Sequence, residues 1–411
     1  MNRIIGLSVA FLVVFSVIVL AIFLFKALDS GAVFWNNPLS FELSGLTGDF
    51  IGGVIGTVFS AGAFLLMYLT LHVQQTNARK DQIENRFFRL VELHRKNVEE
   101  MEFDASGQLF DPDTVSVENK IHKGKAVFHV VFKQMTACRN ELLPFFKYNN
   151  DDVIYELEYY NQLKKMPFVI ENKVDLNKLA LIDISYGIVF FGLESEGRQV
   201  LTALYKGKYR RDFISDILDY MALKPAADED KYKRWKYIED RGDMKRKIAI
   251  SKAIKCWRNQ QEYCTEDLRI KDYERIEGFD SAFVKYYGGH QFTLGHYFRH
   301  LFQTVRFMNE QMELSYAAKY GYIKLLRAQL SNYEQAILFY NSLSLLGRDW
   351  EMTPKKNPDC CFSEDDFHLI TKYNLIKNLP CGSQLGVDPR SFYPSVQYET
   401  GPTVNRSVDF H

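Results

Sequence analysis

The sequence predicts an all-α fold, in which an N-terminal transmembrane hairpin of two helices continues into a large helical cytoplasmic domain. Two apolar segments, residues 4–25 and 50–73, each have about the length that a helix needs to cross a bilayer. Neither glycine nor proline occurs between Gly62 and Gly107, so nothing in the sequence ends the second helix at the membrane surface. Beyond it, apolar residues recur at helical spacing and strand signals are few.

The composition fits a membrane-attached protein of balanced charge. The 411 residues are enough for a membrane segment and one large domain or two small ones. Lysine and arginine total 51, as do aspartate and glutamate, so the whole chain has no electrostatic preference for nucleic acid or anionic lipid. The six cysteines include no CxxC pair, and disulfides are not expected if the domain faces a reducing compartment.

Residues 1–25 are predicted to form the first transmembrane helix. A cleaved signal peptide is the alternative, but the 22 uncharged residues of 4–25 exceed the usual apolar region of a signal. No small-residue cleavage site follows at 26–29, so the helix is predicted to stay in the protein. Residues 26–49 then form a short extracytoplasmic connector, in which Trp35 and Pro38 suit an interfacial turn.

The second transmembrane helix is predicted at 50–73, and the charges around it indicate its orientation. Six basic residues follow the helix closely, whereas the connector contains a single basic residue, Lys26. Positive charge is retained on the cytoplasmic side of membranes, so both termini are predicted to be cytoplasmic and the protein to be multi-pass. The six basic residues are Arg79, Lys80, Arg86, Arg89, Arg95 and Lys96.

Small residues recur in the second apolar segment. Gly52, Gly56 and Ser60 lie four residues apart and therefore share one helix face. Small side chains on one face allow another helix backbone to approach closely in a bilayer. We predict that these three residues pack against another helix, with the lipid bilayer and further copies of the chain as partners.

Residues 74–106 are predicted to continue as a helical stalk. Ile83, Phe87, Leu90, His94 and Met101 form an apolar stripe at helical spacing. The stripe packs either against a second protomer, as a short coiled coil, or against the rest of the same chain. Barely three heptads are too few to specify a coiled coil, so packing within the chain is the simpler interpretation.

Residues 119–380 are predicted to form the cytoplasmic all-α domain, followed by a tail at 381–411 that is expected to be poorly ordered. The apolar run after Asp183 reaches only to Glu194, which is too short for a third span, so a buried core helix is predicted. Helices are expected at 119–146, 153–165, 176–193, 198–220, 296–316, 318–346 and 365–379.

Residues 231–258 are strongly basic. Eleven lysines and arginines face only three acidic residues there, with aromatic residues interspersed. Such a segment can lie on anionic lipid, contact nucleic acid or form a solvated helical face, and the sequence leaves these alternatives open.

No motif for enzyme chemistry or for a cofactor is complete. Residues 288–292 lack the Gly-Lys-Ser/Thr ending of a phosphate-binding loop, and Leu193 stands where a nucleophile elbow needs its first glycine. His296 and His300 share a helix face, but no third ligand or glutamate base accompanies them, so zinc is not predicted. We expect no enzyme activity, no cofactor, no metal and no small-molecule substrate.

Arg89 and His94 provide the one weak catalytic alternative. Their Arg-x4-His spacing resembles the HEPN ribonucleases, in which arginine and histidine on facing helices of a dimer handle the phosphate and the proton. Two fixed positions arise often by chance, and the residue after the arginine is leucine here but usually polar in those enzymes.

Several segments together resemble the phage abortive infection family of AbiC-like proteins, which includes two-span membrane effectors of bacterial defence systems, some of them attached to retrons. The resemblance covers the neighbourhood of the second apolar segment and stalk, and much of the C-terminal third. It rests on Gly48–Gly53, Phe87–His94 with Asn97 and Val98, Gly289–His290, Leu294–Phe302, Leu326–Ser331, Phe339–Asn341 and Lys372–Pro380.

The resemblance implies phage defence at the cell inner membrane, through growth arrest or death of the infected cell, and supplies no catalytic residues. A retron reverse transcriptase or its nucleic acid, or a phage-derived trigger, is then a candidate partner. A passive membrane scaffold for a defence complex is a further alternative. The candidate family-motif or partner-binding residues are His296, Arg299, His300, Arg327, Gln329 and Asn341. Four of them, Arg299, Arg327, Gln329 and Asn341, stand among apolar helical neighbours, so some of these four are expected to be inward and hydrogen-bonded.

Overall fold

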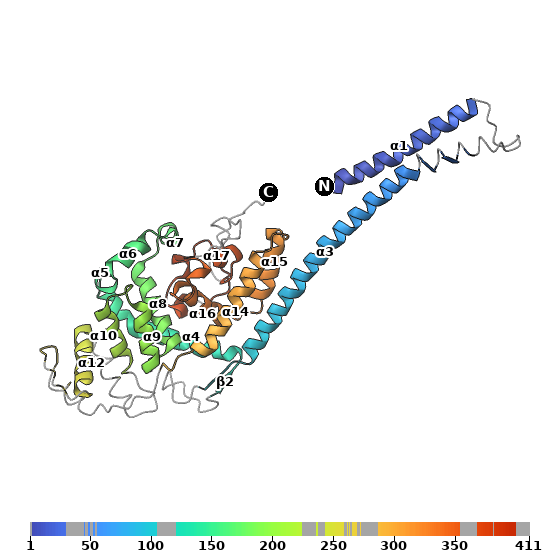
Figure 1. The fold of residues 1–411 in the computed structure, drawn as a ribbon. Coiled ribbons are helices and arrows are strands. Elements are labelled where there is room, and N and C mark those ends of the chain that lie inside the picture. The colour runs from blue at the N-terminus through green and yellow to red at the C-terminus, as the bar shows by residue number, and fades with distance from the viewer. Residues whose placement is uncertain are drawn as a thin grey trace. The chain divides into compact units, whose positions relative to one another are not determined.

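The computed structural model is mostly helical and divides into two compact units, residues 1–86 and 87–411, which are described separately (Figure 1). The described residues are 2–29, 45, 48–49, 52–53, 56–104, 121–223, 236, 243–258, 261, 263, 265–268, 272, 287–353, 368–380 and 382–399.

The first unit contains α1 (Asn2–Asp29) and most of α3 (Gly56–Glu99). By length and composition, α3 is the helix among the described residues that can cross a membrane, while Val14–Phe23 is a shorter apolar stretch in α1. The uninterrupted helix predicted past Gly62 is confirmed to Glu99. The connector lies mostly outside the described residues, so the transmembrane hairpin stays a prediction.

The second unit begins with the last part of α3 and a small antiparallel sheet. Strand β1 (Glu102–Asp104) pairs with β2 (Ile121–Lys123), with Phe103 opposite His122. A helix was expected from residue 119, but α4 (Lys125–Lys147) begins later. The pairing of residues 121–123 and the positive φ of Gly124, +57°, account for the difference.

Three helices form the centre of this unit: α4, α8 (Leu176–Phe191) and α16 (Asn332–Leu343), which pack against one another (Figure 1). Every residue of α8 from Leu179 to Val189 is buried. The prediction of a core helix here, rather than a third span, is therefore confirmed. Asp175 caps the helix by accepting hydrogen bonds from the backbone of Asn177 and Lys178.

Shorter helices cover one side of this centre. The helix expected at 198–220 is two helices, α9 (Ser195–Tyr205) and α10 (Arg211–Met221). Gly207 adopts a φ of +71° between them, and Tyr209 forms an isolated antiparallel bridge with Tyr155. The others are α5 (Asp151–Ile154), α6 (Leu157–Lys164) and α7 (Pro167–Glu171).

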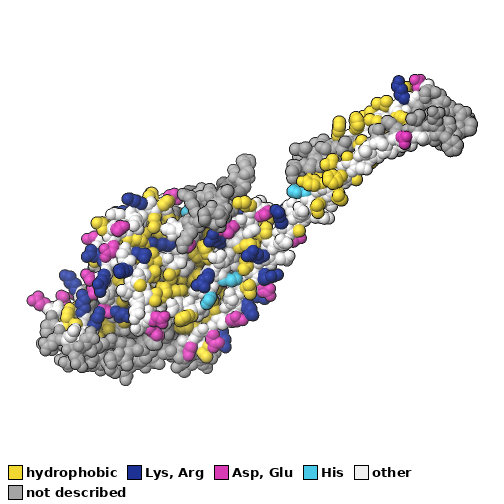
Figure 2. Space-filling view, viewed as in Figure 1, with side chains coloured by type: hydrophobic (Ala, Val, Ile, Leu, Met, Phe, Trp, Pro, Cys, Tyr) yellow, Lys and Arg dark blue, Asp and Glu magenta, His cyan; other side chains and the backbone are white. Residues whose placement is uncertain are grey.

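Helix α12 (Met244–Arg258) forms the described part of the basic segment and packs on α10. Lys252 lies 3.2 Å from Asp216, and Lys255 lies 2.8 Å from Asp219. These pairs favour a helical face held by its own domain over contact with lipid or nucleic acid for 244–258. Figure 2 shows the same mixture of Lys/Arg and Asp/Glu over the helical domain.

The C-terminal third continues with α14 (Gln291–Asn309), α15 (Tyr316–Arg327), α16 and the 3-10 helix η3 (Arg348–Trp350). A single helix was expected at 318–346, but α15 ends at Arg327 and a new helix, α16, begins at Asn332. Ser331 caps α16 in a capping box with Glu334, in which each side chain hydrogen-bonds to the other's backbone N–H.

The end of the described chain packs on the domain, whereas residues 381–411 were expected to be poorly ordered. Helices α17 (Leu369–Tyr373), α18 (Gly382–Leu385) and the 3-10 helix η5 (Pro389–Ser391) lie here. Leu385 and Phe392 are fully buried, and the Tyr340 hydroxyl donates to the Leu385 carbonyl at 2.7 Å. Residues 382–399 therefore pack on the domain through a few buried side chains, and residues beyond 399 lie outside the described part.

Candidate functional site

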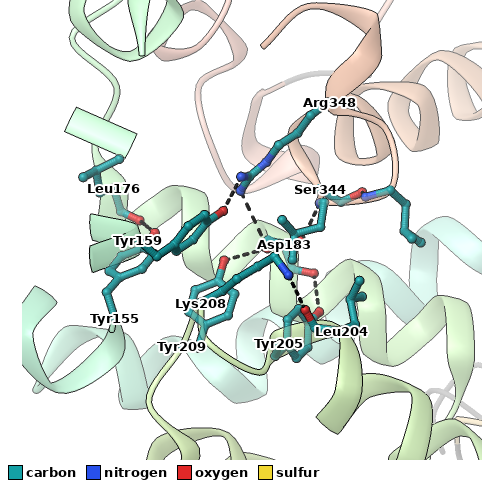
Figure 3. Close-up of polar contacts among 12 residues, drawn as sticks. Tyr155, Tyr159, Leu176, Asp183, Leu204, Tyr205, Lys208, Tyr209, Ser344 and Arg348 are labelled. Carbon is teal, nitrogen blue, oxygen red and sulfur yellow. Dashed lines mark hydrogen bonds and ion pairs between the residues drawn. The ribbon is translucent and has the colours of Figure 1, made fainter. Parts of the chain in front are cut away.

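The buried polar cluster drawn in Figure 3 centres on Asp183 of α8 and is called the Asp183 network here. One carboxylate oxygen, Oδ2, accepts a 2.6 Å hydrogen bond from the Tyr209 hydroxyl. The other, Oδ1, accepts from the backbone N–H of Leu345 at 2.8 Å. The Tyr205 hydroxyl donates to the Asp183 carbonyl at 3.0 Å, so three oxygens of one residue bind two other segments.

Arg348, the first residue of η3, supplies the opposite charge. Its Nη2 atom lies 3.9 Å from Asp183 Oδ2, and its Nη1 donates to the Tyr159 hydroxyl. Both charged side chains are nearly inaccessible to solvent. Tyr155 adjoins the cluster and donates to the Leu176 carbonyl at 2.6 Å. The network thus joins α8, the α9–α10 turn and the α16–η3 segment.

Burial governs the protonation of these groups. It raises the pKa of Asp183, and the charge of Arg348 together with the Tyr209 hydroxyl opposes that rise. Burial also disfavours the charged form of Arg348, but Tyr159 and Asp183 hold its pKa above its ordinary value. Burial raises the pKa of Tyr209 well above its ordinary value, so this hydroxyl remains a hydrogen-bond donor at physiological pH.

The arrangement holds three segments of the helical domain together. All oxygens of Asp183 accept bonds from the protein itself. The Nε and Nη2 atoms of Arg348 form no hydrogen bond. A buried ion pair of this kind contributes to which packing the chain adopts more than to net stability. We therefore interpret the Asp183 network as a clamp between the central helix and the C-terminal third.

The clamp can be tested at Gly187, one turn along α8 from Asp183. A Cβ at this position would collide with the Tyr205 hydroxyl and lie 3.1 Å from Leu201 Cδ2. We expect Gly187→Ala to displace Tyr205 and destabilise the domain by about 1–3 kcal/mol. Thermal unfolding followed by circular dichroism measures this loss.

Gly321→Ala is the matched control, because a Cβ at this exposed position in α15 meets nothing within 4 Å. It should leave stability unchanged or raise it by up to about 1 kcal/mol. Equal melting temperatures for the two variants would contradict the clamp.

A second buried cluster lies where α3 packs against α14. His94 of α3 is 2% exposed, and its ring centroid lies 5.0 Å from that of Tyr297 and 6.0 Å from that of His300. The two imidazole planes are nearly parallel, 20° apart. The Tyr297 hydroxyl donates to the Glu334 carboxylate at 3.1 Å, so it is directed to α16.

Residues 289–354 match the family model described as "Putative phage abortive infection protein". The family suspected from the sequence is confirmed for this segment, which is called the matched segment below. It contains α14, α15, α16 and η3, and therefore both Tyr297 and Arg348. No curated protein and no solved structure matches the chain.

Two of the predicted candidates in the matched segment are inward and hydrogen-bonded, as expected. Asn341 is 4% exposed and donates to the Tyr186 hydroxyl at 2.9 Å. Arg327 donates to the carbonyls of Tyr373 and Asn374, both at 3.0 Å. These contacts give Asn341 and Arg327 structural roles within the domain.

The other candidates in the matched segment lie nearer to solvent. His296, Arg299 and Gln329 are exposed, and His300 is half-buried. Gln329 contributes its carbonyl, which accepts a 2.8 Å hydrogen bond from Lys125. His296, Arg299 and Gln329 are thus the exposed candidates, and a partner-binding role for any of the six stays a prediction.

The alternative catalytic pair is not brought together by the structure. Arg89 is exposed, whereas His94 is buried against α14. The pair therefore does not share an open surface on one protomer. In the described ranges, no group of three or more His, Cys, Asp or Glu residues can hold a metal ion.

The predicted helix-packing residues lie in the first unit. Gly52 and Ser60 are exposed and Gly56 is half-buried. A Cβ added at Gly52 meets nothing within 4 Å. Their packing against another helix stays a prediction.

The sequence reasoning missed Asp183 and Arg348 as a pair. A signal for the first was present, because an aspartate inside the apolar residues 176–191 needs a buried partner. Nothing local pointed to the second, which lies far along the chain. Their contact depends on how α8 packs against the α16–η3 segment.

Proposed function

We propose that the chain is a membrane-anchored effector of bacterial abortive infection defence. In this proposal the helical domain senses infection, and the apolar helices then compromise the inner membrane. The observation that carries the proposal is the continuity of α3: one helix contains an apolar segment long enough to cross a membrane and, at its other end, contacts the matched segment.

The contacts between α3 and the matched segment provide a mechanical connection. Phe87 packs edge-to-face on Tyr322 of α15, with ring centroids 5.3 Å apart, and His94 packs on Tyr297 of α14. A rearrangement of α14 and α15 would therefore act on the helix that bears the apolar segment. Such a transition needs two states that differ by only a few kcal/mol.

Membrane potential is the decisive measurement. Infected cells that express the chain are expected to lose the fluorescence signal of a voltage-sensitive dye early, while cellular RNA is still intact. Uninfected expressing cells and infected cells with an empty vector serve as controls. A membrane-tethered ribonuclease or a passive scaffold would keep the potential, so a preserved potential during growth arrest would refute the proposal.

A further inference from the structure

The contact between α3 and α14 contains two histidines without hydrogen-bond partners. His94, Tyr297 and His300 are together called the histidine seam. Among the described residues, neither Nδ1 nor Nε2 of His94 has a hydrogen-bond partner, and the same holds for both nitrogens of His300. Buried polar groups are hydrogen-bonded in the great majority of cases, so four unpaired imidazole nitrogens in one contact require an explanation.

Among the described residues, no carboxylate is a hydrogen-bond partner of either histidine in the seam. On α14, the nearest polar neighbour of His94 is Tyr297, whose hydroxyl is bound to Glu334 of α16. That glutamate also accepts from the backbone N–H of Ser331. From α4, Lys125 acts on His94 with a positive charge, and Phe128 packs on Tyr297 at 4.7 Å.

We propose that the histidine seam is a proton-operated latch. Both rings pack as neutral, nearly apolar groups when the latch is closed. Protonation of either ring places a positive charge beside the second imidazole, and for His94 also near Lys125, with no hydrogen-bond acceptor among the described residues. The contact between α3 and α14 then opens. That the latch regulates membrane damage rests on the proposed function. That it opens on protonation does not.

The electrostatics give the direction of the response. Burial, then the charges of His300 and Lys125, lowers the pKa of His94 from 6.5 to about 4. Burial also lowers the pKa of His300. Because the closed form binds protons more weakly than an exposed histidine, the latch is fully stable above about pH 6.5 and weakens as the pH falls toward 4. Acidification of the cytosol, which follows a proton leak, is therefore the opening signal.

Hydrogen exchange of the full-length protein in lipid nanodiscs tests the latch. Between pH 7.5 and 5.5, after correction for the intrinsic pH dependence of exchange, the open fraction of residues 87–99 should rise about tenfold from the His94 shift alone. His94→Phe should remove most of this rise, since phenylalanine fills the site and does not titrate. His300→Gln, at a half-buried position, is a second variant that should reduce it.

His296→Phe is the matched control, because His296 lies one turn from His300 on the same helix and is exposed. It should retain the wild-type response. A wild-type open fraction that is equal at the two pH values would overturn the latch, and so would an undiminished rise in His94→Phe. Cells acidified with a weak acid then test the consequence: a seam that opens without loss of membrane potential supports the latch and refutes the proposed function.

Discussion

Arg348→Leu is expected to lower the free energy of unfolding of the helical domain by about 3–5 kcal/mol, since it leaves a buried carboxylate without its counter-charge. Asp183 would keep the hydrogen bonds from Tyr209 and Leu345, but it would lose the only cation that the structure places within 4 Å of its carboxylate among the described residues. Denaturant unfolding of the full-length protein in detergent, followed by circular dichroism, measures the change.

The double variant Asp183→Leu/Arg348→Leu distinguishes the interaction between the two charges from the contacts that each residue makes with other groups. Each single variant leaves one buried charge without its partner, whereas the double variant leaves none. The double variant should therefore lose less stability than the sum of the losses in the two single variants. Lys178→Leu is the matched control on the same helix, because Lys178 forms an exposed pair with Asp175 and should change stability by less than about 1 kcal/mol. Additive losses in the double variant would show that the two charges do not act together.

The elements that follow from local patterns were predictable. The continuous α3 was indicated by the absence of glycine and proline, and α8 by an apolar run too short for a membrane span. The helix breaks at Gly207 and Ser331 also had local signals, because a glycine between helical segments and a Ser-x-x-Glu sequence mark helix ends. Both signals place helix ends where the structure has them.

The long-range features were not predictable from one sequence. Asp183 and Arg348 lie 165 residues apart, and no periodicity connects α8 with η3. The packed tail has the same cause: Tyr393 is buried because Ser342 and Phe339 of α16 receive it, and a sequence rich in proline and serine gives no sign of that partner. The prediction that residues 50–73 cross a membrane rests on length and composition alone, for the sequence and for the structure.

The double substitution Gly52→Leu/Gly56→Leu is expected to abolish toxicity and depolarisation while leaving expression and membrane insertion intact. Leucine favours a transmembrane helix as much as glycine does or more, so insertion is not impaired. A leucine side chain on this face would nevertheless hold a second helix away, and close approach of backbones is what small residues at four-residue spacing permit. Depolarisation, measured with the dye assay, should fall to the level of the empty vector.

Gly62→Leu is the matched control in the same apolar segment. On an ideal helix Gly62 lies about 80° from Gly52, about 120° from Gly56 and about 160° from Ser60, so it is displaced from the centre of the small-residue face. A Cβ meets nothing within 4 Å at Gly62 or at Gly52, so a substitution at either position has room among the described residues. Any difference between the variants must therefore arise from contacts with another helix. If the double variant remained as toxic as the wild type, α3 would serve as an anchor, and the damage to the cell would have to come from the helical domain or from its partner.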